Sequence, residues 1–178
     1  MAQDSDKTVS SLAAAASEAS RKGPAPVHLW NPDYCGEMDL TIRADGTWVH
    51  EGRVIARPEM VRLFASVLKR EGDRFFLVTP VEKLGITVED APFLAIDADI
   101  TPDSITFATN VGDRVTAGPD NPIRVEDPDR TPRPYVHVRR GLDALIDRKT
   151  FYRLVEAAET GSDGRLVLRS AGAEFELG

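Results

Sequence analysis

Two stretches of this chain have similar residue patterns, and this internal similarity constrains the fold more than any other feature of the sequence. Residues 55–64 follow the pattern Ile-x-Arg-x-x-Met-Val-Arg-Leu-Phe, and residues 146–155 follow Ile-x-Arg-x-x-Phe-Tyr-Arg-Leu-Val. Each stretch opens a predicted helix and comes after a strand-like segment that contains Val-His, although the spacing between the two parts differs. Either chance supplies this likeness, or an internal duplication has produced two similar strands-then-helix units.

Short β-prone segments and turns surround these stretches, so the chain reads as an α+β protein. Residues 39–43 and 48–50 flank an Asp45-Gly46 turn that is typical of a hairpin. In the second half, strands are expected at residues 93–96, 104–108, 114–117, 123–125 and 135–138, with a closing hairpin over 165–177 and a mobile loop at 126–134. We expect antiparallel sheets that each pack against a helix.

Three helices are predicted from caps and apolar spacing. Residues 1–9 look like a frayed tail, and Ser10 or Ser11 caps a short helix that ends at residues 23–24. Pro58 suits the first position of a second helix, whose apolar face continues to a stop at Gly72. Asp147 caps the third helix.

The expected division of the chain is a tail and short helix over 1–25, a first α+β unit over 26–87 and a strand-rich α+β unit over 88–178.

The acidic composition narrows the classes of partner. The 178 residues carry a net charge of −7, which disfavours a nucleic acid polymer or an anionic membrane as partner. No apolar run approaches the roughly 20 residues of a membrane span, and Asp4 and Asp6 before Lys7 do not suit a signal peptide. The single cysteine, Cys35, excludes an internal disulfide, so we expect a cytoplasmic protein.

Several short motifs of the sequence resemble those of an uncharacterised bacterial group, domain-of-unknown-function family 1285. The resemblance covers residues 26–158 and rests on the phrases Trp30-Asn31-Pro32, Cys35-Gly36, Asp45-Gly46-Thr47-Trp48, Leu77-Val78-Thr79-Pro80-Val81-Glu82-Lys83, Glu89-Asp90-Ala91-Pro92-Phe93, Thr109-Asn110-Val111-Gly112-Asp113 and Pro134-Tyr135-Val136-His137-Val138. It implies a duplicated α+β fold whose second unit is pleckstrin-homology-like. It also implies a pocket between the units for a nucleotide-like ligand, and a role in bacterial signalling or stress response, but no reaction.

Arginines supply the most suggestive candidate site residues. Arg57 and Arg148 open two predicted helices, where a guanidinium and free backbone donors favour a phosphate or carboxylate. The alternative is that these arginines pair with the many acidic side chains. An aromatic side chain such as Trp48 can stack on a base or belong to the core. The candidate ligand-binding set is Arg57, Thr79, Glu82, Lys83, Arg139, Arg148 and Trp48.

Other chemistry lacks a pattern in the sequence. Cys35 is a redox candidate in a predicted loop, but no cationic neighbour adjoins it, and a packed, inert cysteine is the alternative. The spacing of Cys35, His28, His50 and His137 fits no paired metal-ligand pattern, so no metal is expected. No catalytic serine motif, phosphate loop or dinucleotide fingerprint occurs, so we expect no cofactor and no catalytic residue.

Three functions remain open from the sequence. The first is a non-enzymatic module that senses a small anionic or nucleotide-like ligand between its units. The second is an adaptor that holds a protein partner through strand edges or the loop Glu126–Arg133. The third is an enzyme whose site is assembled from distant residues.

Overall fold

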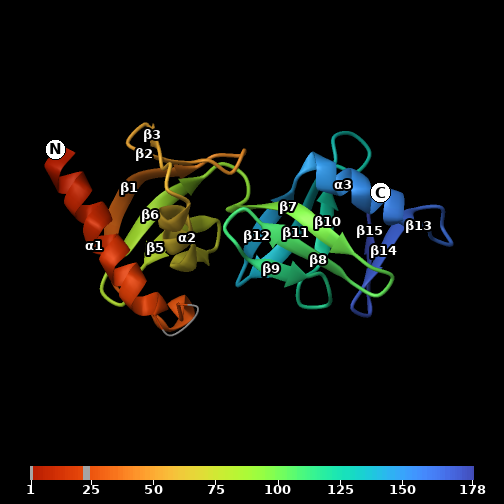
Figure 1. Ribbon diagram of the computed structural model, residues 1–178, viewed down its shortest axis with the longest axis horizontal. Coiled ribbons are helices and arrows are strands. Elements are labelled where there is room, and N and C mark those ends of the chain that lie inside the picture. The colour runs from red at the N-terminus through yellow and green to blue at the C-terminus, as the bar shows by residue number, and fades with distance from the viewer. Residues whose placement is uncertain (1, 22–24) are drawn as a thin grey trace. The chain divides into compact units, whose positions relative to one another are not determined.

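The chain divides into two units, Met1–Glu89 and Asp90–Gly178, and each unit has its own six-stranded sheet. The computed structural model, drawn in Figure 1, describes residues 2–21 and 25–178. Each unit is described below by itself. Among the described residues, no helix is both long enough and apolar enough to pass through a membrane.

The first unit combines its sheet with two α-helices (Figure 1). The strand order is β3-β2-β1-β6-β5-β4, in which the central pair β1–β6 is parallel and the other neighbours are antiparallel. In chain order, the elements are α1 (Ala2–Ser20), the 3-10 helix η1 (Val27–Leu29), β1 (Tyr34–Ile42), β2 (Trp48–His50), β3 (Arg53–Val54), α2 (Pro58–Ser66), β4 (Leu68–Glu71), β5 (Arg74–Val78) and β6 (Lys83–Val88).

The second unit contains a six-stranded sheet, a helix and a small three-stranded sheet. The larger sheet has the order β10-β11-β12-β7-β8-β9, and its central pair β12–β7 is parallel. The elements are β7 (Phe93–Ile100), β8 (Ile105–Thr109), β9 (Arg114–Thr116), β10 (Ile123–Glu126), β11 (Arg133–Arg139), β12 (Leu142–Ile146), α3 (Arg148–Ala157), β13 (Glu159–Thr160), β14 (Leu166–Ser170) and β15 (Ala173–Glu176).

The two large sheets share one strand plan. Each consists of two three-stranded antiparallel meanders, and the first strand of one meander lies parallel to the last strand of the other. The expected purely antiparallel sheets are therefore wrong, because the strands that join the two meanders run in the same direction. The helices differ in place: α2 stands between the meanders, whereas α3 follows the second meander. The similarity between residues 55–64 and 146–155 suggests equivalent positions for Arg57 and Arg148. In the structure, their positions in the two units are not equivalent.

Helix α1 begins earlier than expected, because the residues predicted to form a frayed tail are mostly helical. It begins at Ala2, and its side chains Leu12 and Ala16 are completely buried. These two residues lie four apart and therefore share one face of the helix. The hydroxyls of Ser20 and Ser66 join α1 to α2 at 3.1 Å. The expected stop at residues 23–24 falls outside the described residues.

Helix α2 is shorter than its apolar pattern predicts. It ends at Ser66, and the chain continues as β4, which pairs with β5 through Leu68 and Leu77. Gly72 lies in the turn of this hairpin with a φ of 59°, a value that favours glycine. Val67 follows the helix and Leu68 begins β4, and both are fully buried, so tertiary packing overrides helical periodicity here.

The acidic, proline-rich segment expected as a loop is shorter than predicted. Strands β10 and β11 extend to the cross-strand pair Glu126 and Arg133, whose side chains form an ion pair at 2.9 Å. The turn itself spans residues 127–132.

Candidate ligand-binding site

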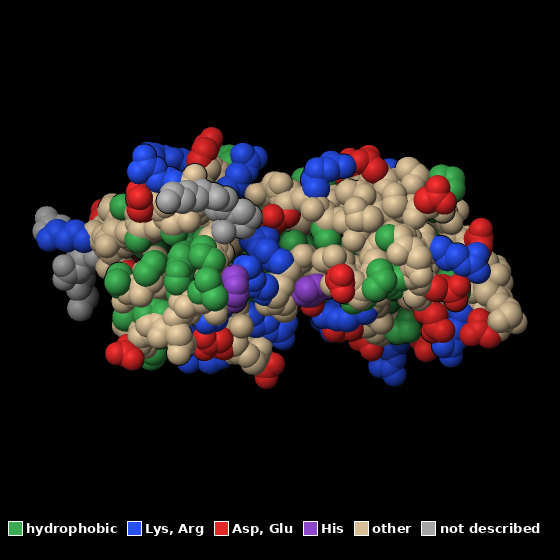
Figure 2. Space-filling model, turned by 90° about the horizontal axis from the view of Figure 1, so that it is seen from below, with side chains coloured by type: hydrophobic (Ala, Val, Ile, Leu, Met, Phe, Trp, Pro, Cys, Tyr) green, Lys and Arg blue, Asp and Glu red, His purple; other side chains and the backbone are tan. Residues whose placement is uncertain are grey.

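The first unit contains a largely apolar cavity of about 280 Å³. Its walls come from α1, the end of β2, the segment between β3 and α2, and α2 itself. The lining residues are Val9, His50, Ile55, Ala56, Arg57, Met60 and Phe64. In the view of Figure 2, hydrophobic side chains gather on the first unit beside basic side chains and a histidine. The cavity is therefore an apolar space with one guanidinium and one imidazole in its wall.

Local sequence brings these walls together. A tight turn at Glu51 and Gly52, with φ angles of 48° and 75°, reverses the chain between β2 and β3. The amide of Ile55 then donates to the carbonyl of Trp48 at 2.9 Å, which holds the segment after β3 against β2. Pro58 starts α2, because its fixed φ suits the first helical position.

Arg57 is the charged residue of the cavity wall. Its backbone is extended at the start of α2, and its carbonyl accepts hydrogen bonds from the amides of Met60 at 3.1 Å and Val61 at 3.3 Å. Among the described side chains, those of residues 6–21 and 25–178, the exposed guanidinium of Arg57 has no hydrogen-bond or ion-pair partner. Because a guanidinium prefers a carboxylate or phosphate partner, this side chain is available to an anion.

Trp48 adds an unsatisfied polar group nearby in the sequence. The side chain is 1% exposed, and its indole Nε1 has no acceptor among the described residues. Trp48 and His50 are two apart on β2, so their side chains leave the same face of the strand. A buried donor without an acceptor costs about 1–3 kcal/mol. Trp48 itself does not line the cavity.

The predicted residues around the β5–β6 turn have structural partners. Thr79 is completely buried, and its hydroxyl accepts hydrogen bonds from the amides of Glu82 at 3.1 Å and Val81 at 3.4 Å. Lys83 contacts Glu71 at 2.5 Å and lies 4.4 Å from the centre of the Phe76 ring. The turn fixes Thr79 and Glu82 beside each other, but none of the three predicted residues lines the cavity.

A network of charges covers this part of the first sheet. The hydrogen bond from Lys83, together with that from Lys69, holds the pKa of Glu71 below its ordinary value. The hydroxyl of Tyr34 donates to Glu37 at 2.5 Å, and Arg74 pairs with the same carboxylate. A Cβ at residue 85 would collide with the Glu37 carboxylate, so Gly85 makes room for it. The charges satisfy one another, which is typical of a structural network.

The remaining predicted residues lie elsewhere. In the second unit, Arg139 pairs with Asp113 and stands 5.0 Å from the centre of the Phe93 ring. Arg148 is exposed at the start of α3, where the Asp147 carboxylate accepts the amide of Thr150 at 2.8 Å. Cys35 is exposed, and its Sγ donates to the carbonyl of Asp33 at 3.2 Å.

Of the seven predicted ligand residues, Arg57 alone lines this cavity. The apolar wall was missed because its members come from α1, β2 and α2, and no spacing rule links such distant segments. The sequence contains a partial indication of this wall, since Ile55, Met60 and Phe64 belong to the first of the two similar stretches, residues 55–64. The described residues contain no cluster of three or more side chains suited to hold a metal ion.

Two solved structures are similar to this chain. A DUF1285 family protein from Silicibacter pomeroyi DSS-3 has 55% sequence identity and a TM-score of 0.85, over 93% of each chain. A DUF1285 family protein from Shewanella baltica OS155 has 29% identity and a TM-score of 0.57, over 68% of this chain and 94% of that chain. No curated protein matches the sequence.

Family models match almost the whole chain. Residues 25–91 match the N-terminal domain of the domain of unknown function DUF1285, and residues 92–177 match the C-terminal domain of the protein of unknown function DUF1285. The chain therefore belongs to the DUF1285 family.

Proposed function

We propose that this chain is a non-catalytic protein that binds a small anionic ligand in the cavity of its first unit. The observation that carries this proposal is the guanidinium of Arg57, which has no partner among the described residues and stands in the wall of an otherwise apolar cavity. A ligand with a compact apolar body and a carboxylate or phosphate group complements both features.

The size of the cavity supports a small ligand. Its volume of about 280 Å³ lies just below the range for ligand pockets, roughly 300–1,000 Å³, so only a small ligand would fit. Five of the seven lining residues, Val9, Ile55, Ala56, Met60 and Phe64, are apolar. A short-chain carboxylate or alkyl phosphate fits such a wall better than a nucleotide, whose base and sugar carry many polar groups that need partners.

The chemistry of the same wall supports a non-catalytic role. Among the described residues, His50 is the one lining side chain that commonly transfers protons, and no nucleophilic side chain lines the cavity with it. Binding alone can act as a signal, because a ligand that prefers one conformation shifts the population towards it.

We also propose that the two units arose by internal duplication, since both large sheets have the same meander plan and the same central parallel pair. The likeness of the second unit to a pleckstrin-homology domain stays a prediction.

Thermal unfolding followed by tryptophan fluorescence tests the ligand, because Trp30 and Trp48 both belong to the first unit. The probes are hexanoate, hexyl phosphate and AMP, with hexylamine as the cationic counterpart. A bound probe at a hundredfold excess over its Kd stabilises the folded state by about 2.7 kcal/mol. We expect the anionic alkyl probes to raise the melting temperature and to shift the NMR signal of the Ile55 methyl group.

Two variants locate the anion. Arg57→Gln removes the charge in the cavity wall and should weaken anion binding about tenfold. Arg53→Gln is the matched control, since it removes an exposed arginine from β3, outside the lining. The proposal fails if no anionic probe shifts the Ile55 signal, or if Arg53→Gln weakens binding as much as Arg57→Gln.

A further inference from the structure

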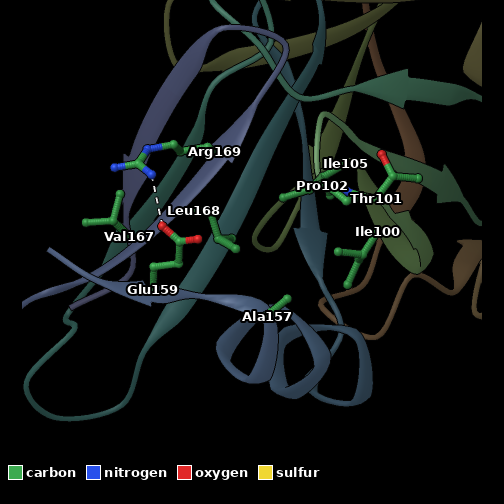
Figure 3. Close-up of a pocket in the computed structure, with 9 residues that line it drawn as sticks. All are labelled: Ile100, Thr101, Pro102, Ile105, Ala157, Glu159, Val167, Leu168 and Arg169. Atoms are coloured by element: carbon green, nitrogen blue, oxygen red, sulfur yellow. Dashed lines mark hydrogen bonds and ion pairs between the residues drawn. The ribbon is translucent and has the colours of Figure 1, made fainter.

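A second cavity, of about 380 Å³, lies in the second unit. It is bounded by the β7–β8 hairpin, the last residue of α3 and the strands β13 and β14 (Figure 3). Its lining includes Ile100, Ile105, Ala157, Glu159, Leu168 and Arg169. In Figure 3 the side chains of Ile100, Ala157 and Leu168 surround the space from different elements.

The floor of this cavity is apolar and firmly held. Ile105 is 1% exposed and Leu168 is 3% exposed, so both belong to the core. The buried hydroxyl of Ser170 accepts the amide of Ile105 at 2.8 Å and donates to the carbonyl of Ala117 at 2.7 Å. These bonds fix β14 against the larger sheet. The cavity is therefore already formed before any ligand binds.

The rim of the cavity has an excess of negative charge. The guanidinium of Arg169 contacts two carboxylates, that of Glu159 at 2.9 Å and that of Glu174 at 3.1 Å. Glu159 and Arg169 line the cavity and balance each other, and Glu174, just outside the lining, leaves the three groups with one net negative charge. All three side chains are more than half exposed, so these ion pairs are weak and can exchange partners.

The end of α3 adds to this negative field. Ala157 is the last residue of the helix and lines the cavity. The carbonyl groups of a final turn carry the negative end of the helix dipole. The final turn of α3, residues 154–157, contains no basic side chain that would offset it. A cation at this rim would be favoured by both Glu159 and the helix end.

We propose that this cavity binds a primary alkylamine. The alkyl chain lies against the floor formed by Ile105 and Leu168, and the ammonium group lies at the rim beside Glu159. An alkyl carboxylate has the same apolar body but meets the excess negative charge, and an alcohol gains no ionic contact. This site is independent of the anion site in the first unit.

NMR of the full chain with labelled isoleucine methyl groups tests the proposal, using hexylamine, hexanoate and hexanol as probes. The methyl groups of Ile100 and Ile105 report on this cavity, and that of Ile55 reports on the cavity of the first unit. We expect hexylamine to shift the Ile100 and Ile105 signals saturably, and hexanoate and hexanol to bind there more weakly. Hexylamine that shifts Ile55 alone, or hexanoate that binds at Ile100 as tightly as hexylamine, would overturn the proposal.

Charge variants distinguish a direct contact between the ammonium group and Glu159 from a general attraction by the negative charge near the cavity. Glu159→Gln should weaken hexylamine binding by about two- to fivefold, the range of an exposed ion pair. Glu174→Gln is the matched control, because it removes the same charge from the same arginine but lies outside the lining. The variant should change binding less than Glu159→Gln. Equal effects of the two variants, with both proteins folded by their NMR spectra, would show that no ammonium group sits beside Glu159.

Discussion

Tyr135 shows how one side chain can tie the start of the second unit to its sheet. The residue is 3% exposed on β11, and its hydroxyl donates to the carboxylate of Asp90 at 2.6 Å. The guanidinium of Arg124 stands 4.3 Å from the centre of its ring. Burial, followed by the hydrogen bond to Asp90, raises the pKa of Tyr135 well above its ordinary value.

This raised pKa predicts a loss of stability in alkali. The folded state keeps the phenol proton at a pH where the unfolded chain releases it, so the contribution is complete below about pH 10 and declines as the pH rises further. Tyr135→Phe should remove this contribution. We expect the stability difference between the wild type and Tyr135→Phe to shrink above about pH 10, as measured by urea unfolding with circular dichroism. A constant difference across this range would contradict the assignment.

At the scale of elements, α1 is the part whose role the sequence left most open. Its composition of alanine and serine allowed either light packing or a loose segment. In the structure, Leu12 and Ala16 are fully buried and Val9 lines the ligand cavity. Helix α1 therefore contributes both to the core of the first unit and to its proposed site.

Truncation of Leu12 tests this packing. Leu12→Ala should lower the free energy of unfolding by about 2–5 kcal/mol, because it removes a buried side chain and leaves a cavity. The exposed neighbouring variant Ser11→Ala should change it by less than about 0.5 kcal/mol. Urea unfolding followed by tryptophan fluorescence measures both, since the two tryptophans belong to the first unit. Equal values for the two variants would mean that α1 does not pack on the core in solution.

Local chemistry predicted several elements well. The Asp45-Gly46 turn is confirmed, with the Asp45 carboxylate accepting the amide of Thr47 at 2.9 Å. The cap at Asp147 is confirmed as well. In contrast, the central strands β6 and β12 had no clear signal. Gly85 interrupts the pattern of β6, and β12 is short and contains Asp143 and Ala144, which have low β propensity.

The candidate site was less predictable than the fold. A charged residue such as Arg57 can be singled out because it starts a helix, which is a local feature. A cavity has no local feature, since it depends on gaps between side chains of distant segments. Lys83 was singled out by its charge in the same way, and in the structure its ammonium group contacts Glu71 and the ring of Phe76.

At the scale of the whole molecule, the two units have separate cores. The largest fully buried side chains include Trp48 and Phe64 in the first unit and Phe93 and Phe107 in the second. Each unit completes its own large sheet without a strand from the other. This division gives each unit what an independent folding domain requires.

We therefore predict that residues 90–178 fold alone. The fragment should show a cooperative thermal transition by circular dichroism, and its NMR methyl signals should overlay those of the same residues in the full chain. The full chain provides the matched reference, because its tryptophan fluorescence reports the first unit only. A fragment that lacks a cooperative transition would show that the second unit depends on the first.

The parallel pair at the centre of each large sheet has a consequence for synthesis of the chain. Strand β1 finds its central partner only when β6 has been made, and Thr41 pairs there with Thr87, almost at the end of the first unit. On the ribosome, each half of that sheet can form its own hairpins early, but the halves cannot join until the last strand emerges. A nascent chain that stalls before Lys83 leaves the inner edge of β1 open to wrong partners.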